Sequence, residues 1–145
     1  MVAKWSRVVV GVDGSDGSLK ALQWAAEIAK ERHTELTVVM ALRPSLPPLP
    51  GVSPSYSTHD DVDPQLQAEQ RLLESIHKVL GEEPRVLVHP EVRNESAAKA
   101  LIEASKSADL LVVGRRGVGG FAGMLLGSVS QHVAAHAHCS VVVVR

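Results

Sequence analysis

Six glycines lie within the segment LLVVGRRGVGGFAGMLLGSVS, residues 110–130, and they suit a loop whose backbone approaches a ligand closely. The segment begins as an apolar, strand-like run and ends with Gly127-Ser128 at the start of a helical pattern. Free N–H groups at a helix start favour anions, and Arg115 and Arg116 add cationic donors. The chemistry would be phosphate binding. The same residues also suit a plain surface loop with Ser128 as a helix cap, so composition leaves both interpretations open.

A second unusual loop, Asp13-Gly14-Ser15, follows the apolar run RVVVGV at 7–12. In doubly wound parallel sheets, ligands bind beyond the carboxyl ends of strands, where the strand order reverses. If the strands at 7–12 and 109–114 are neighbours at that point, both loops face one crevice. The order of motifs therefore places two special loops where a ligand would need them.

Two familiar phosphate motifs are excluded. The chain has no Gly-Lys pair, so it contains no GxxxxGK[ST] loop. Residues 117–122 fit a relaxed GxGxxA pattern, but no acidic residue follows, whereas a dinucleotide site needs one about 20 residues on. A nucleotide site here would have to use another arrangement.

Metal and nucleophile sites have weaker support. A zinc site would draw on closely spaced side chains near the end of the chain: His132, His136, His138 and Cys139. The last two fall beyond the helix, so we interpret the histidines as cations favoured at a helix C-terminus. Asp60, Asp61 and Asp63 lack calcium-loop spacing and are read as a solvated loop with a helix cap. No GxSxG motif is present, so nothing supports nucleophilic catalysis.

The elements that must position these loops follow from hydrophobic periodicity. Apolar runs predict strands at 7–12, 36–42, 85–89, 109–114 and 140–144. Helical spacing predicts helices from Ser18, from Asp63-Pro64 to a stop at Gly81, over 94–107 and over 128–137. Residues 43–62 hold five of the eight prolines and are predicted to form one long connection. Alternating strands and helices predict an α/β three-layer sandwich with a five-stranded parallel sheet, in a single domain over 1–145.

Three of the predicted helices have a clear apolar side. The first carries Leu19, Leu22, Ala25, Ala26 and Ala29; the second Leu66, Leu73, Ile76 and Leu80; the third Ala98, Leu101, Ile102 and Ser105.

Composition argues against nucleic acid and membranes as partners and bears on the cellular compartment. The formal net charge is −1, which gives no electrostatic footprint for nucleic acid or an anionic membrane. No apolar window reaches the length of a membrane span, and no signal peptide is evident. Cys139 is the only cysteine, which suits a reducing compartment. We expect a cytoplasmic protein.

The spacing Gly114-x2-Gly117-x9-Gly127-Ser128 resembles the ATP-binding signature of the universal stress protein family. VVVGVDGSDGSLKALQWAA resembles that family's first strand and helix, and ADLLVVG through the final arginine resembles its C-terminal third. One departure is Asn94, where the family often has glycine; asparagine tolerates left-handed backbone. The resemblance implies strand order 3-2-1-4-5.

The resemblance also implies a binding site and its ligands. Asp13 would lie near the adenosine, Ala41 would meet adenine through its backbone, and Val12 would flank the base. The ribose and phosphate binders would be Gly114, Gly117, Gly127, Ser128 and Val129, with Arg116 beside them. The implied ligand is ATP with Mg²⁺ bridging its phosphates, held by a regulatory module. Open alternatives are a slow ATP hydrolase or phosphotransferase, a relative that prefers cyclic AMP or AMP, and a relative that has lost nucleotide binding.

The strand at 140–144 would end the sheet, and a bare apolar edge invites pairing. Antiparallel pairing with a second copy would cover it, and the resemblance implies such a homodimer. The alternative is a monomer whose edge is guarded only by Arg145.

Overall fold

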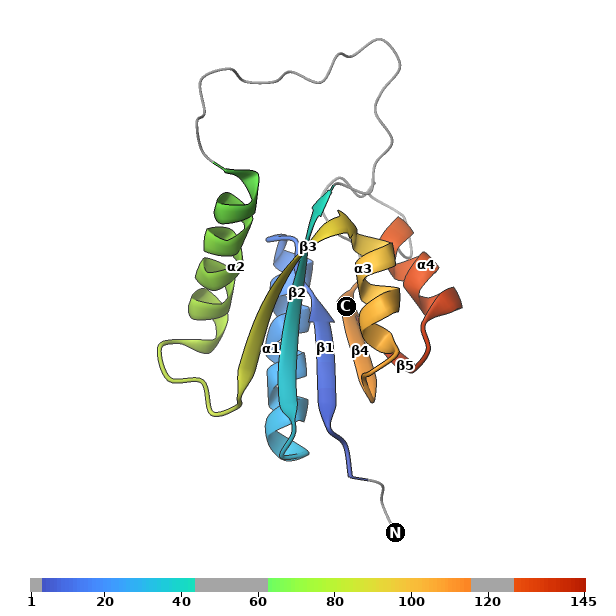
Figure 1. Ribbon diagram of the computed structural model, residues 1–145. Coiled ribbons are helices and arrows are strands. Elements are labelled where there is room, and N and C mark those ends of the chain that lie inside the picture. The colour runs from blue at the N-terminus through green and yellow to red at the C-terminus, as the bar shows by residue number, and fades with distance from the viewer. Residues whose placement is uncertain (1–3, 44–62, 116–126) are drawn as a thin grey trace.

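The structure, a computed structural model, describes residues 4–43, 63–115 and 127–145. Five parallel strands form one sheet in the order β3-β2-β1-β4-β5, which confirms the expected fold and strand order (Figure 1). The strands are β1 (Arg7–Gly11), β2 (Glu35–Arg43), β3 (Val88–Ser96), β4 (Leu110–Gly114) and β5 (Ser140–Val144). The helices are α1 (Asp16–Glu31), α2 (Pro64–Leu80), α3 (Ala97–Ser105) and α4 (Ser128–His136). Most of the predicted connection at 43–62 lies outside the described residues, and Arg43 belongs to β2.

The central strands are buried on both faces because helices cover both sides of the sheet. Val8 and Val10 of β1 pack into the core formed with α1 and α2, whereas Val9 packs into the core formed with α3 and α4. All three are at most 1% exposed. β-branched residues pack well on such a surface, which explains why RVVVG forms a strand.

Strand β3 differs from its prediction. It begins at Val88 and runs through Pro90 to Ser96, whereas apolar content predicted a strand that ended before this proline. The pairing with β2 explains why the strand continues past Pro90. β2 is nine residues long, and β3 pairs with it with Val38 opposite Pro90. Since β3 is an edge strand, a residue without an N–H donor is tolerated there. The predicted helix at 94–107 consequently starts only at Ala97.

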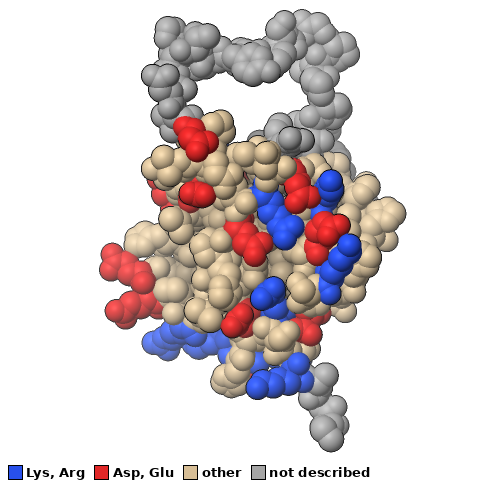
Figure 2. All heavy atoms as spheres, viewed as in Figure 1, with Lys and Arg blue, Asp and Glu red and all other residues tan. Residues whose placement is uncertain are grey.

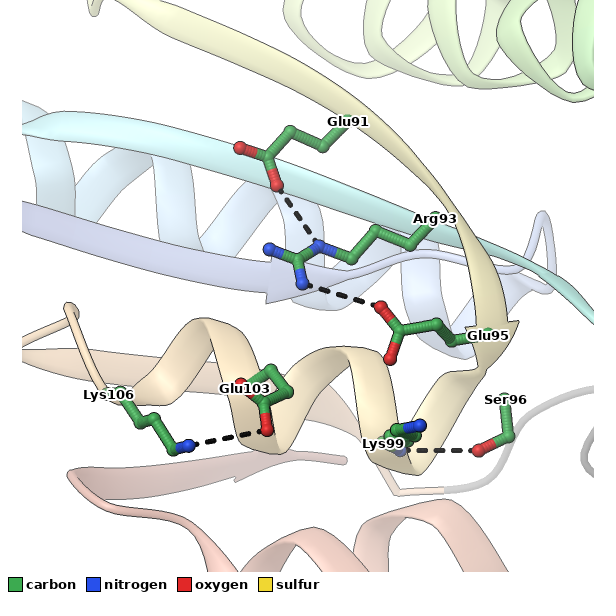
Figure 3. A network of polar contacts seen from close by, with 7 residues as sticks. All are labelled: Glu91, Arg93, Glu95, Ser96, Lys99, Glu103 and Lys106. Atoms are coloured by element: carbon green, nitrogen blue, oxygen red, sulfur yellow. Dashed lines mark hydrogen bonds and ion pairs between the residues drawn. The ribbon is translucent and has the colours of Figure 1, made fainter.

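One face of β3 carries charge rather than apolar side chains. Arg93 lies between Glu91 and Glu95, with N–O distances of 3.5 and 3.6 Å (Figure 3). At the C-terminal end of α3, Lys106 pairs with Glu103 at 3.3 Å. Figure 2 shows acidic and basic side chains interspersed on the visible surface. Pairs exposed to this degree contribute little to stability, so we read this face as solvated.

The buried side of α2 also differs from its prediction. Its buried residues are Ala68, Leu72 and Ile76, spaced four apart, whereas Leu66 and Leu73 are 48% and 55% exposed. Only one of the adjacent Leu72 and Leu73 can face inward, and α2 turns Leu72 toward α1 and the sheet. The predicted seam was therefore wrong at Leu66 and Leu73 and right at Ile76.

The apolar sides predicted for the first and third helices agree more closely with the buried residues of α1 and α3. In α1 the predicted stripe is buried except for Leu19, which is partly buried. In α3 Leu101 and Ser105 are buried as predicted, Ala98 and Ile102 are only partly buried, and Ala100 and Ala104 complete the inner face.

The starts of β1 and β4 are joined by one carboxylate. Asp109 accepts hydrogen bonds from the backbone N–H groups of Ser6 and Arg7 at 2.7 and 2.9 Å. Partial burial raises the pKa of Asp109, but these hydrogen bonds outweigh it, so the pKa lies below its ordinary value. This junction lies at the end of the sheet opposite the carboxyl ends, and it fixes the two central strands side by side.

Candidate functional site

The carboxyl ends of β1 and β4 lie together, as the motif order led us to expect. The two strands are neighbours in register, with Val8 opposite Leu110 and Val10 opposite Val112. The contact continues past the strands. A Cβ placed on Gly114 would lie 2.8 Å from both the carbonyl carbon and oxygen of Gly17. The end of β4 therefore rests directly on the first turn of α1, which holds the two loops at one edge.

The loop after β1 is ordered by its own polar groups. The Asp13 carboxylate accepts from the Ser15 N–H at 2.9 Å and from the Ser15 hydroxyl. The Asp13 N–H donates to the Ser18 hydroxyl at 3.2 Å, and Gly14 adopts a φ of +87°, which suits glycine. Ser15 caps α1, which therefore begins two residues before its predicted start at Ser18. These bonds fix an exposed carboxylate at the mouth of the crevice.

The two described ends of the glycine-rich segment are joined to each other. The Gly127 N–H donates to the Arg115 carbonyl at 2.7 Å, and the Arg115 N–H donates to the Val144 carbonyl at 2.9 Å. The Ser130 hydroxyl donates to the Gly114 carbonyl at 2.6 Å, and Ser130 is 3% exposed. Sequence reasoning missed Ser130; its signal was a serine on the inward side of the last helix. It ties the start of α4 to the end of β4.

The start of α4 is left without a side-chain cap. Its cap residue is Gly127, which is buried, and Ser128 is the first helical residue and exposed. The interpretation of Ser128 as the helix cap was therefore wrong, because Gly127 occupies that position. Val129 is partly buried against the core of α3 and α4. The predicted Arg116 and Gly117 lie outside the described residues.

A groove of about 460 Å³ opens at the carboxyl ends of β1 and β2, between α1 and α2. Asp13 and Ala41, two of the predicted adenosine contacts, line it together with Gly14, Met40 and Leu42. Val12 lies elsewhere. Its side chain is 4% exposed in the core, and its N–H donates to the Val39 carbonyl at 2.9 Å. The structure thus brings Asp13 and Ala41 into one groove and places Val12 in the core.

The histidine and cysteine side chains near the C-terminus do not converge. The rings of His132 and His136 lie 4.7 Å apart, whereas Cys139 contacts the Ser140 carbonyl through its own sulfur. Burial, and then the negative charge of Asp109, raise the pKa of the Cys139 thiol, which disfavours a metal-binding thiolate. Within residues 4–43, 63–115 and 127–145, no group of three or more His, Cys, Asp or Glu side chains is arranged to hold a metal.

Comparison with known protein families shows which family this chain belongs to. The profile of the universal stress protein family matches residues 4–145. The chain belongs to the universal stress protein family. A universal stress protein of Mycolicibacterium smegmatis is 37% identical over 142 residues, covering 95% of this chain and 47% of that protein. One of Methanocaldococcus jannaschii is 35% identical over 144 residues, covering 97% of this chain and 82% of the relative. The chain thus spans about half the length of the first relative.

Solved universal stress proteins share the fold. One from Lactobacillus plantarum superimposes with a TM-score of 0.76 at 21% identity, covering 99% of this chain and all of the other. A universal stress protein in complex with cAMP has a TM-score of 0.71 at 29% identity, covering 99% and 98% of the two chains. One from Archaeoglobus fulgidus in complex with dAMP has a TM-score of 0.68 at 19% identity, covering 99% and 100%.

No helix in the described part of this universal stress protein is long and apolar enough to span a membrane.

Proposed function

We propose that this universal stress protein binds ATP, with Mg²⁺ bridging the phosphates, and acts as a regulatory binding module in the cytoplasm. One observation carries the proposal: the groove beside Asp13 and the start of α4 both lie at the carboxyl edge of the sheet, and that helix start has no side-chain cap. Free N–H groups there suit phosphate, and the groove suits a nucleoside. The solved relatives with cAMP and dAMP support an adenine nucleotide as the class of ligand.

The residues present fit ATP by position and type. Adenosine would occupy the groove beside Asp13 and Ala41, and the phosphates would meet the backbone of Gly127 and Ser128 at the start of α4. Mg²⁺ would neutralise part of the phosphate charge. The predicted roles of Gly114, Arg116, Gly117 and Val129 belong to the same proposal. Val12 would support the site from the core beneath it.

Calorimetric titration of the nucleotide-stripped protein with Mg-ATP tests this function. We expect saturable binding of about one ATP per chain and its loss in Gly117→Val, because a bulky side chain would obstruct the phosphate cradle. Leu73→Ala, which truncates an exposed residue of α2, serves as the control and should bind as the wild type does. Unaltered affinity in Gly117→Val would remove the role of the glycine motif. No binding up to millimolar Mg-ATP would remove ATP as the ligand.

Cyclic AMP is the second candidate ligand, because the solved relative at 29% identity is a complex with cAMP. Competition between cyclic AMP and Mg-ATP in the same titration ranks the two. An ATP hydrolase is less favoured. Asp13, the carboxylate that follows β1, already accepts hydrogen bonds from Ser15, so it is poorly placed as a base. Turnover above about 1 s⁻¹, ordinary for phosphotransferases, would reverse this ranking.

The proposal extends to a homodimer formed through β5. The sheet places β5 at one edge, as predicted, and Val141 to Val144 are each half-buried. An apolar edge of this kind is protected when a second copy pairs with it. We expect sedimentation velocity at micromolar concentration to give twice the mass of one chain. A monomer across that concentration range would contradict pairing through β5.

A further inference from the structure

The groove at the carboxyl edge has a second wall, formed by α2. Its lining residues on this helix recur with helical periodicity along one side, at Pro64, Gln67, Ala68, Arg71, Glu74, Ser75 and Lys78. Because α2 runs opposite to the strands, its first turn lies at their carboxyl ends (Figure 1). Pro64 and Gln67, in this first part of α2, line the same groove as Ala41 and Leu42, where the proposed function puts the nucleoside. The sequence motifs gave no role to this helix.

Gln67 stands out among the residues of this wall. Its side chain is half-buried and makes no hydrogen bond within the described residues, whereas the amide of the nearby Gln65 already donates to Glu69 at 3.0 Å. The groove it lines has both apolar and charged residues; Met40 and Ala68 give it apolar surface, at 6% and 7% exposure, and Arg71 and Glu74 give it charge. Gln67 thus offers a neutral donor and acceptor beside apolar surface that suits a base.

The chemistry of a carboxamide matches the edge of adenine. Adenine presents an exocyclic amino donor beside a ring-nitrogen acceptor, and a glutamine side chain can satisfy both at once. The cations further along α2, Arg71 and Lys78, lack an acceptor for the amino group and pair better with the acceptor edge of guanine. Gln67 is therefore the residue of this wall suited to read an adenine edge.

We propose that Gln67 hydrogen-bonds the 6-amino edge of the base and is a specificity-determining residue of the groove. The inference rests on the proposed nucleotide function and adds to it a residue outside the glycine and Asp13 motifs. It also assigns a role to α2, whose N-terminal turn then closes the base end of the site.

A ligand series on the intact chain tests the contact. The probes are Mg-ATP and the Mg-triphosphate of purine riboside, which lacks the 6-amino group. We expect the wild type to prefer ATP about tenfold, the effect of one hydrogen bond in a groove of this kind. Gln67→Met keeps the length and apolar contact of the side chain but cannot make the bond, so it should bind both probes with equal affinity. Gln70→Ala, an exposed position on the same helix, is the matched control and should keep the preference.

The outcomes separate this inference from the function on which it rests. If the wild type binds ATP and Gln67→Met keeps the full preference, or if the wild type shows none, the role of Gln67 is overturned and nucleotide binding stands. If the wild type binds neither probe, both proposals fail. Gln67→Glu gives a second readout, since an acceptor alone leaves the ring nitrogen unpaired. It should weaken ATP by about tenfold and weaken purine riboside triphosphate at least as much.

Discussion

Gly114→Ala is expected to destabilise the protein by about 3 kcal/mol, the upper part of the usual range for overpacking a tight contact. The added Cβ would lie 2.8 Å from the backbone carbon and oxygen of Gly17, and backbone cannot rotate away as a side chain can. The first turn of α1 would have to move off the end of β4. Since α1 carries the capped loop at Asp13, the same substitution should also weaken nucleotide binding. Urea unfolding followed by circular dichroism measures the stability.

Gly11→Ala is the matched control for this result. Gly11 ends β1, and a Cβ there would lie 2.7 Å from a methyl carbon of Leu101 on α3. That methyl group can be displaced by a small rotation of the side chain, so we expect a loss of about 1 kcal/mol. Equal losses in the two variants would show that contact with the α1 backbone does not determine the requirement for glycine at position 114.

Leu72→Ala is expected to reduce the free energy of unfolding by about 3 kcal/mol, as for other truncations of a fully buried leucine. Leu72 is 1% exposed and belongs to the core shared with α1 and the sheet. Its neighbour Leu73 is 55% exposed, so Leu73→Ala should change stability by less than about 0.5 kcal/mol. Denaturant unfolding of both variants compares two identical truncations one residue apart. A larger loss for Leu73→Ala would restore the seam predicted from the sequence.

The sequence by itself determined the alternation of strands and helices and the two loops of the candidate site. The β1 run VVV and the β4 run LLVV are apolar without interruption, which is typical of strands buried on both faces of a sheet. Asp63-Pro64 and Gly81 marked the ends of α2 because capping depends on a few adjacent residues. The spacing of glycines and Ser128 likewise identified the family, since the signature is local.

Only the tertiary structure decided which face and which partner each element uses. Local periodicity left Leu72 and Leu73 nearly equivalent, and packing against α1 selected Leu72. From the sequence, Pro90 indicates the end of a strand. In the structure β3 is an edge strand paired with β2, so the missing N–H of Pro90 is tolerated. Ser130 donates a hydrogen bond to the Gly114 carbonyl, and Gln67 lines a groove with residues at the end of β2. Both sets of neighbours are distant in sequence. Such contacts depend on how the elements are assembled, and a pattern read along one segment does not contain that information.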